Sequence, residues 1–123
     1  MLALLVYVNI ESCGFAYEEH ITGRYYIVGG DISAERNLCY SLSGRSGYIG
    51  KAPGQLQAYG FNDTFLVAKT SEYNPGKDVY YIINMKKDGE FAHEEDFRVG
   101  PVSENDYKTK WRNRLNIALK KLK

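Results

Sequence analysis

The middle of the chain alternates apolar and polar residues with the period of two that is typical of β-strands. These runs are separated by segments rich in Gly, Asn, Asp and Ser, which favour turns. The runs cover residues 24–28, 38–42, 55–61, 64–70 and 79–85. Asn62-Asp63 stands between the third and fourth runs, and its tolerance of left-handed backbone predicts a tight hairpin. The pattern therefore predicts an antiparallel meander of about five strands.

The last part of the chain changes to the period of a helix. Gly100-Pro101 interrupts the strand pattern, and Ser103 followed by Asp106 resembles a capping box with Asp where Glu is usual. Apolar residues then recur at helical steps, at Tyr107, Trp111, Leu115, Ala118 and Leu122. This stripe predicts an amphipathic helix over about residues 104–122. The fold class we expect is α+β: one antiparallel β-sheet with one C-terminal amphipathic helix packed on it.

Composition adds an uneven distribution of charge. The chain has 123 residues, of which 44% are hydrophobic, so we expect a single domain with its own core over residues 14–123. The formal net charge is +1, but residues 103–123 hold seven Lys or Arg and two acidic residues, which leaves +5 there and −4 elsewhere. A basic helix could bind the phosphates of nucleic acid or of anionic lipid. Because no nucleic-acid motif accompanies it, we favour a solvated outer face.

The N-terminus has two interpretations. Residues 1–8 are all apolar, which is too short for a bilayer span of about 20 residues but suits an export signal. The segment Ile10-Glu11-Ser12-Cys13-Gly14 resembles a bacterial lipobox, in which the cysteine is acylated, although no Lys or Arg precedes the apolar run. Residues 1–13 are therefore either a truncated lipoprotein signal, with Cys13 as the lipidation site, or an N-terminal strand. The first places the protein in the bacterial cell envelope, and the second in the cytoplasm.

The sequence lacks the arrangements that catalysis or metal binding usually needs. There are only two histidines, His20 and His93, and neither a nucleophile elbow nor a phosphate-binding loop occurs. Cys13 and Cys39 do not have the spacing of a zinc site, and a buried free thiol is the expectation for Cys39. The acidic residues at 90–96 lack metal-ligand spacing and predict a solvated loop. We expect no enzyme, no metal and no other cofactor.

Tyrosine supplies the main binding candidates. The chain has eleven tyrosines, and the adjacent pairs at 25–26 and 80–81 must each place their rings on opposite faces of a strand. Outward rings could bind a glycan or a protein partner, whereas cross-strand aromatic pairing is the alternative. The candidate binding residues are Tyr25, Tyr59 and Tyr80 on the predicted strands and Lys120, Lys121 and Lys123 at the basic end of the predicted helix.

Several segments together carry a resemblance. They are Phe65-Leu66-Val67-Ala68-Lys69, Tyr80-Tyr81-Ile82-Ile83, Gly100-Pro101-Val102-Ser103 and Leu115-Asn116-Ile117. In this order, after a signal that ends in cysteine, they resemble a family of small bacterial lipoproteins of unestablished function, with a tyrosine-rich sheet and a C-terminal helix. The resemblance covers about residues 22–117. It implies an address in the bacterial envelope and brings no catalytic residues.

These observations lead to one functional expectation and two alternatives. We expect a small envelope lipoprotein that binds a protein or an envelope component, with a protein as partner and the membrane reached through Cys13. The first alternative is an immunity or inhibitor protein that occludes a toxin partner. The second is a small nucleic-acid-binding module that uses the basic C-terminal helix, although nucleic acid is not our first choice.

Overall fold

The computed structural model describes residues 17–30, 35–43, 47–71 and 77–122, and within them two antiparallel sheets. The first sheet has four strands in the order β1-β2-β3-β4. Its strands are β1 (Tyr17–Thr22), β2 (Tyr25–Gly29), β3 (Arg36–Ser41) and β4 (Tyr48–Gly50). Each strand pairs with the next one along the chain, so this sheet is a meander.

The second sheet has five strands in the order β8-β7-β6-β5-β9. They are β5 (Gln55–Phe61), β6 (Phe65–Ser71), β7 (Asp78–Asn84), β8 (Arg98–Ser103) and β9 (Lys120–Lys121). A short helical turn, α2 (Glu94–Phe97), precedes β8. Strand β9 is the last strand in the sequence, and it pairs with β5 to form one edge of the sheet.

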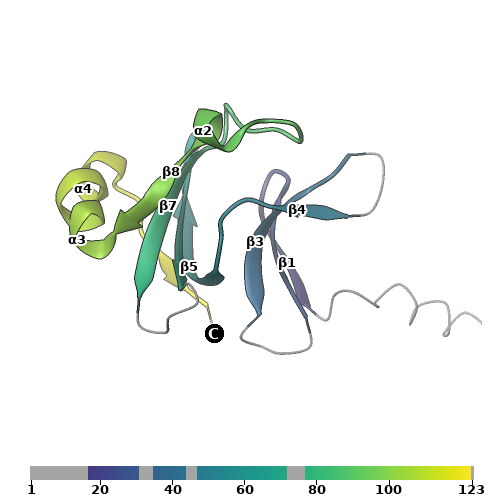
Figure 1. The fold of residues 1–123 in the computed structure, drawn as a ribbon, viewed down its shortest axis with the longest axis horizontal. Helices are drawn as coiled ribbons and strands as arrows, with labels where there is room; N and C mark the ends of the chain where they lie inside the picture. Colours follow the sequence, from purple (N-terminus) through teal and green to yellow (C-terminus); the bar gives the residue numbers. More distant parts are fainter. Residues whose placement is uncertain (1–16, 31–34, 44–46, 72–76, 123) are drawn as a thin grey trace, which may run out of the picture.

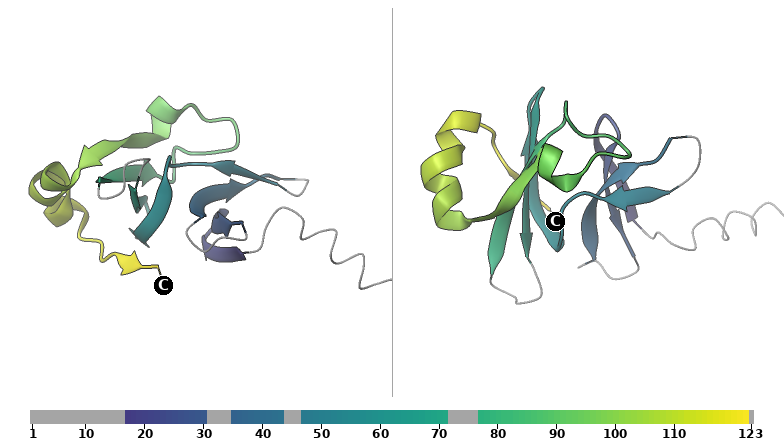
Figure 2. Two further views of the ribbon diagram at one scale, coloured as in Figure 1. Left: turned by 60° about the horizontal axis from the view of Figure 1, so that its bottom comes forward. Right: turned by 45° about the horizontal axis from the view of Figure 1, so that its top comes forward.

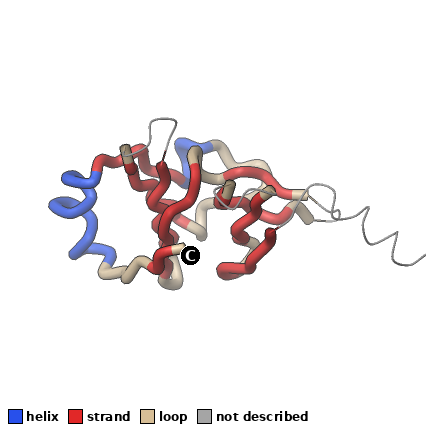
Figure 3. The backbone as a smooth tube through the Cα atoms, turned by 90° about the horizontal axis from the view of Figure 1, so that it is seen from below, coloured by secondary structure: helices blue, strands red, loops and turns tan. Residues whose placement is uncertain are grey.

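One helix follows β8. It consists of α3 (Glu104–Asp106), the π turn η2 (Tyr107–Trp111) and α4 (Arg112–Leu115). Figure 1 shows three layers: this helix, the five-stranded sheet in the middle and the four-stranded sheet on the other side. The view from the side of the C-terminus shows the same order, with the helix at one end of the molecule (Figure 3). No helix in the described part of the chain is long and apolar enough to cross a membrane.

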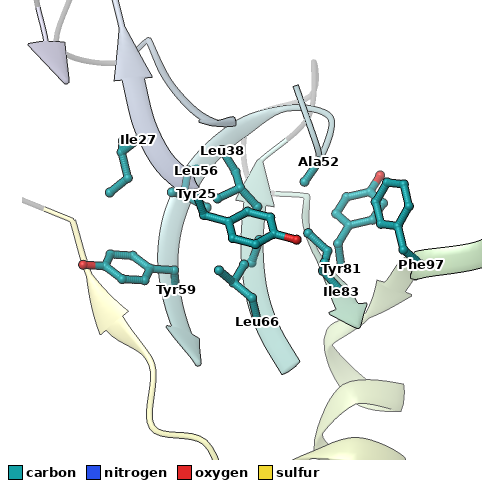
Figure 4. Close-up of a cluster of buried hydrophobic side chains, with 11 residues drawn as sticks. Tyr25, Ile27, Leu38, Ala52, Leu56, Tyr59, Leu66, Tyr81, Ile83 and Phe97 are labelled. Carbon is teal, nitrogen blue, oxygen red and sulfur yellow. The ribbon is translucent and has the colours of Figure 1, made fainter. Parts of the chain in front are cut away.

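Two hydrophobic clusters hold the three layers together. The larger cluster fills the space between the sheets and contains residues from both of them (Figure 4). Its members are Tyr25, Ile27, Leu38, Ala52, Leu56, Tyr59, Leu66, Ala68, Tyr81, Ile83 and Phe97. The smaller cluster lies between the five-stranded sheet and the helix, and contains Val67, Tyr80, Ile82, Tyr107 and Leu115. The middle sheet is therefore covered on both faces, which explains the nearly continuous apolar runs in β6 and β7.

The expectation of a mainly antiparallel α+β fold agrees with this structure, but the single sheet is not what it shows. The predicted strands divide between two sheets, because the chain crosses from β4 to β5 through residues 51–54. Asn37 Nδ2 donates a hydrogen bond to the Gly54 carbonyl at 3.0 Å and so ties this crossing to β3. Period-two alternation reports which residues share a face, but not which sheet a strand joins.

The helix is shorter than the sequence predicts. It ends at Leu115 because Asn116 has left-handed backbone angles, with φ 52° and ψ 48°. The remaining residues run back along the five-stranded sheet to β9 (Figure 2). Ala118 and Leu122 are therefore not part of the helical stripe, and Lys120 and Lys121 lie on a strand instead of a helix end.

Two local predictions are confirmed, although Asn62 and Asp63 do not have the left-handed backbone on which the prediction of the hairpin was based. Asn62 Oδ1 accepts hydrogen bonds from the backbone N–H groups of Thr64 and Phe65, at 2.9 and 2.7 Å, and closes the tight hairpin between β5 and β6. Ser103 is the N-cap of the helix, and its hydroxyl accepts a hydrogen bond from the Asp106 N–H at 3.1 Å. In both places a short polar side chain pairs backbone groups that the turn would otherwise leave free.

Candidate binding cleft

The space between the two sheets is closed at one end and open at the other. The segment 84–97 runs across the closed end, at the top of Figure 1, and the C-terminus lies at the open end, at the bottom. Two ionic contacts, one buried and one partly exposed, lie at the closed end. A cleft opens at the other end, between the edge strands β1 and β9.

The closed end is built around a buried ion pair. Lys51 Nζ lies 2.8 Å from Asp88 Oδ1, and the two side chains are 3% and 0% exposed. The hydroxyl of Tyr25 donates to the other carboxylate oxygen at 2.6 Å. The ammonium also lies 5.0 Å from the centre of the Tyr40 ring and 4.5 Å from that of Phe97. A buried charge pair needs this full set of partners to offset its lost hydration.

A second ionic contact lies beside the first. Glu90 Oε2 lies 2.7 Å from Arg24 Nη2 and accepts a hydrogen bond from the Ser43 N–H at 2.8 Å. The bonds from Arg24 and Ser43 lower the pKa of Glu90 to about 2. These contacts bind the segment 84–97 to the four-stranded sheet. The predicted acidic loop at 90–96 is therefore bound to the rest of the fold at Glu90, its first residue, and Asp88 forms the buried pair just before it.

At the open end lies a cleft of about 330 Å³, which we call the edge cleft. It is lined by Tyr17, Glu19, Arg36, Tyr59, Lys120, Lys121 and Leu122. Its walls come from β1 and β3 of one sheet and from β5, β9 and the residue after β9 of the other. Its volume lies at the lower end of the range of about 300–1,000 Å³ that is typical of ligand sites.

The wall from the four-stranded sheet combines aromatic and charged groups. The guanidinium of Arg36 lies over the Tyr17 ring, 3.7 Å from its centre. The Tyr17 hydroxyl donates a hydrogen bond to the Glu19 carboxylate, and this bond is the main cause of the raised pKa of Tyr17. Arg36 is thus held by its face on an aromatic ring, which leaves its N–H donors at the edge of the guanidinium.

The opposite wall is set by the register of β9 on β5. Lys120 pairs with Tyr59, and Lys121 with Ala58. Residues directly opposite each other in an antiparallel pair share a face. Tyr59 belongs to the cluster between the sheets, so Lys120 lies on the same face of the sheet as that cluster. Lys121, the next residue along β9, lies on the opposite face. Leu122 returns to the inner side, where it packs against the same cluster.

The edge cleft has an excess of positive charge. Within the described ranges, no carboxylate lies within 4.0 Å of the charged groups of Arg36, Lys120 or Lys121. Among the described residues of the lining, Glu19 is the single acidic side chain, and it is bonded to Tyr17. The described lining thus places three cations and one carboxylate around a concave surface, which makes it attractive to an anion.

The structure brings together only some of the candidate binding residues. Tyr59, Lys120 and Lys121 meet at the edge cleft. The prediction of outward rings at Tyr25 and Tyr80 is corrected, because these side chains are 3% and 4% exposed. Tyr59 is also a buried core residue, 8% exposed, although it borders the cleft. Cys13 and Lys123, the other candidates, lie outside the described residues.

Both corrected tyrosines have structural partners. Burial and the hydrogen bond to Asp88 raise the pKa of Tyr25, so its hydroxyl stays a donor. Tyr80 stacks on Tyr107 of the helix, with 4.2 Å between ring centres. Tyr80 and Tyr81 do point to opposite faces, as adjacent strand residues must. Both are buried because the helix covers one face and the other sheet covers the second.

The sequence alone does not indicate the cleft residues Tyr17, Glu19 and Arg36, or the buried pair of Lys51 and Asp88 at the closed end. The strand that carries Tyr17 and Glu19 has the sequence Tyr-Glu-Glu-His-Ile-Thr, in which three consecutive polar residues interrupt any alternation of apolar and polar positions. Lys51 and Asp88 lie 37 residues apart, and no local pattern connects them. Their pairing follows from the way in which the sheets stack.

Other chemical groups in the described part of the chain do not form a second site. Cys39 is a buried free thiol, as expected, and burial raises its pKa to about 11. No group of three or more His, Cys, Asp or Glu side chains among the described residues is placed to hold a metal ion. The basic residues that were predicted on one helix are divided between the helix and β9.

Comparison of the chain with protein-family models, with curated proteins and with solved structures finds no match.

Proposed function

We propose that this protein is a small non-enzymatic binding module that holds a protein partner at the edge cleft. One observation carries the proposal: the cleft gathers Tyr59, Lys120 and Lys121, three of the residues selected from the sequence, beside Tyr17 and Arg36. Tyrosine and arginine are the residue types that are enriched in protein interfaces. The two sheets form a rigid frame around these side chains, so little ordering is needed when a partner binds.

The cleft is also better suited to binding than to bond cleavage. Its described polar groups are the Tyr17 hydroxyl, which is bonded to the Glu19 carboxylate, and the hydroxyl of Tyr59. The cations Arg36, Lys120 and Lys121 complete the set. This set supplies hydrogen-bond donors and positive charge, which recognise a ligand. Catalysis by a nucleophile would instead need a side chain such as Ser or Cys within hydrogen-bond distance of a general base.

The cellular address is a separate part of the proposal. We propose that Cys13 anchors the protein at the bacterial envelope, on the basis of the lipobox-like sequence around it. Metabolic labelling with a lipid precursor tests this in cells that express the native gene product. Label on the peptide that contains Cys13 is the expected result, and an unmodified Cys13 contradicts the anchor.

Photo-crosslinking in living cells tests the binding site. A photoreactive amino acid replaces Lys120 in one variant and Lys110 in a control, because Lys110 is an exposed lysine on the helix, away from the cleft. We expect one defined protein adduct at position 120 and none of the same mass at position 110. Identification of a toxin in that adduct would assign the partner to the immunity alternative. No adduct at position 120, or equal adducts at both positions, contradicts the proposed function.

A further inference from the structure

We infer that the edge cleft recognises an acidic segment of its protein partner, bound in an extended conformation beside β9. This inference rests on the proposed function and adds the chemistry of the ligand. Three features of the cleft carry it: its unpaired cations, its apolar walls and the strand edges on either side.

The first feature is charge. Arg36, Lys120 and Lys121 surround the cleft, and none of them has a carboxylate partner among the residues that the structure describes. Other exposed cations of the described residues, such as Lys110 and Arg114, also lack such partners, so the distinctive feature is that three of these cations line one cleft. The edge cleft is thus a place where carboxylates from another molecule can complete the ionic contacts.

The second feature is the pair of aromatic walls. Tyr17 and Tyr59 line the cleft from opposite sheets, and Leu122 adds an aliphatic side chain. Tyr59 presents little of its ring, being 8% exposed, and Arg36 covers part of Tyr17. The methylene groups of a glutamate side chain can pack on the apolar surface that these residues and Leu122 leave in the cleft, while its carboxylate reaches the cations. Glu19 also lies in the lining, and its negative charge disfavours a doubly charged phosphate more than a singly charged carboxylate. The cleft therefore favours an acidic peptide over a phosphate group.

The third feature is the pair of strand edges. In the described part of the chain, β9 has a strand neighbour only on the side of β5, and β1 only on the side of β2. Both edge strands contribute residues to the cleft. Exposed edges bind extended peptides through backbone hydrogen bonds, while pockets select alternate side chains. Lysine on β9 discourages pairing with uncharged strands, so an acidic strand is the complementary partner.

A binding experiment with defined peptides tests the inference. The probe is a fluorescent, terminally blocked octapeptide of alternating threonine and glutamate, and its counterpart has glutamine in place of glutamate. We expect the full chain to bind the glutamate peptide and to lose affinity as salt is added. Lys120→Ala and Arg36→Gln should each weaken binding by about tenfold, as expected when one hydrogen bond to a charged group is lost.

Matched variants make the test specific. Lys110→Ala removes an exposed lysine on the helix and should leave affinity unchanged. Arg36→Lys keeps the charge but not the planar guanidinium, and should weaken binding less than Arg36→Gln does. Lys120 is exposed, so its substitution does not threaten folding. Equal unfolding midpoints of the variants and the parent protein would show that binding alone has changed.

Several results would overturn the inference. Equal affinity for the glutamate and glutamine peptides would remove the ionic basis of recognition. Binding of inorganic phosphate or of phosphatidylglycerol vesicles at the cleft, without binding of the peptide, would replace the acidic segment by a phosphate ligand. An equal loss of affinity in Lys110→Ala and Lys120→Ala would show that net charge, and not the cleft, attracts the peptide. If a cross-link at position 120 identifies a partner in any of these cases, the proposed function stands and only the inference fails.

Discussion

Lys51 and Asp88 are the residues on which the closed end of the sandwich depends. Both side chains are almost fully buried, and each oxygen of the carboxylate has a donor, one from the lysine and one from Tyr25. A pair of this kind contributes little by forming, because both ions lose their water. It is costly to break, because one buried ion is then left without a partner.

Asp88→Asn should therefore lower the free energy of unfolding by about 3–5 kcal/mol. The amide cannot balance the Lys51 ammonium, which is 3% exposed. Urea unfolding followed by fluorescence measures the change. The control is Glu104→Gln, which removes one partner of an exposed pair with Lys108 and should leave the midpoint almost unchanged. Equal effects of the two substitutions would contradict the assigned importance of the buried pair.

The stability of the folded protein depends on pH through Glu90. Its pKa is lowered from the ordinary 4.5 to about 2 by hydrogen bonds from Arg24 and Ser43. The unfolded chain therefore takes up this proton at a higher pH than the folded chain. The stability that Glu90 contributes is complete above the unfolded pKa and is lost as the pH falls toward the folded one.

Comparison of the parent protein with Glu90→Gln isolates this contribution. The difference in their unfolding free energies should be constant near neutral pH and should shrink as the pH falls from about 5 to about 2. Chemical unfolding at a series of pH values measures it. A difference that stays the same across that interval would show that Glu90 is not ionised preferentially in the folded state.

Single residues also show where sequence analysis succeeds. Asn62 and Ser103 have roles that depend on residues three or fewer positions away, and both were predictable. Tyr25 and Tyr80 were not, because their burial depends on which layer covers each face of the strand. The sequence indicates that neighbouring tyrosines point apart, but only the tertiary structure shows that both directions lead into a core.

Among the strands and helices, the elements with strong periodicity were the predictable ones. The strands at 25–29, 36–41, 55–61, 65–71 and 78–84 follow the alternating runs closely. Strands β1, β4, β8 and β9 were not predicted, because their sequences are polar, very short or interrupted by Gly100-Pro101. These four are stabilised by the neighbour that each of them joins, and local propensity adds little.

The path of the chain after the helix depends on Gly60. A Cβ atom at Gly60 would overlap the Ala118 carbonyl oxygen and lie 2.7 Å from Ile117 Cγ2. The missing side chain allows the segment 117–119 to lie close against β5 and to bring β9 to the edge cleft. A helix to residue 122 was predicted because its periodicity continues, whereas this contact is invisible in the local sequence.

Gly60→Ala should push the segment 117–122 away from β5. We expect faster hydrogen exchange at the Leu122 amide, which now donates to the Gln57 carbonyl at 3.0 Å, and weaker binding of the glutamate peptide. The cost of such overpacking is typically about 1–3 kcal/mol. Gly50→Ala is the control, since a Cβ atom there meets nothing within 4 Å. Unchanged exchange at Leu122 in Gly60→Ala would contradict the role of this glycine.

Considered as a whole, the molecule is a sandwich with two different ends. The closed end is sealed by the segment 84–97, and the open end carries the edge cleft. The α+β class follows from the sequence, and three of its candidate binding residues, Tyr59, Lys120 and Lys121, line the cleft, although the sequence does not bring them together. It could not identify the other wall, because Tyr17 and Arg36 meet those residues only when the two sheets stack.

The central claim is that the edge cleft is the binding site of this protein, and the position of a bound acidic peptide tests it most directly. Backbone amide NMR spectra of the full chain, recorded during titration with the glutamate octapeptide, locate the contact. We predict that the largest shift changes occur at Tyr17, Glu19, Arg36, Tyr59 and Leu122, which line the cleft. Shift changes confined to the helix at residues 104–115, with the cleft signals unmoved, would contradict the account.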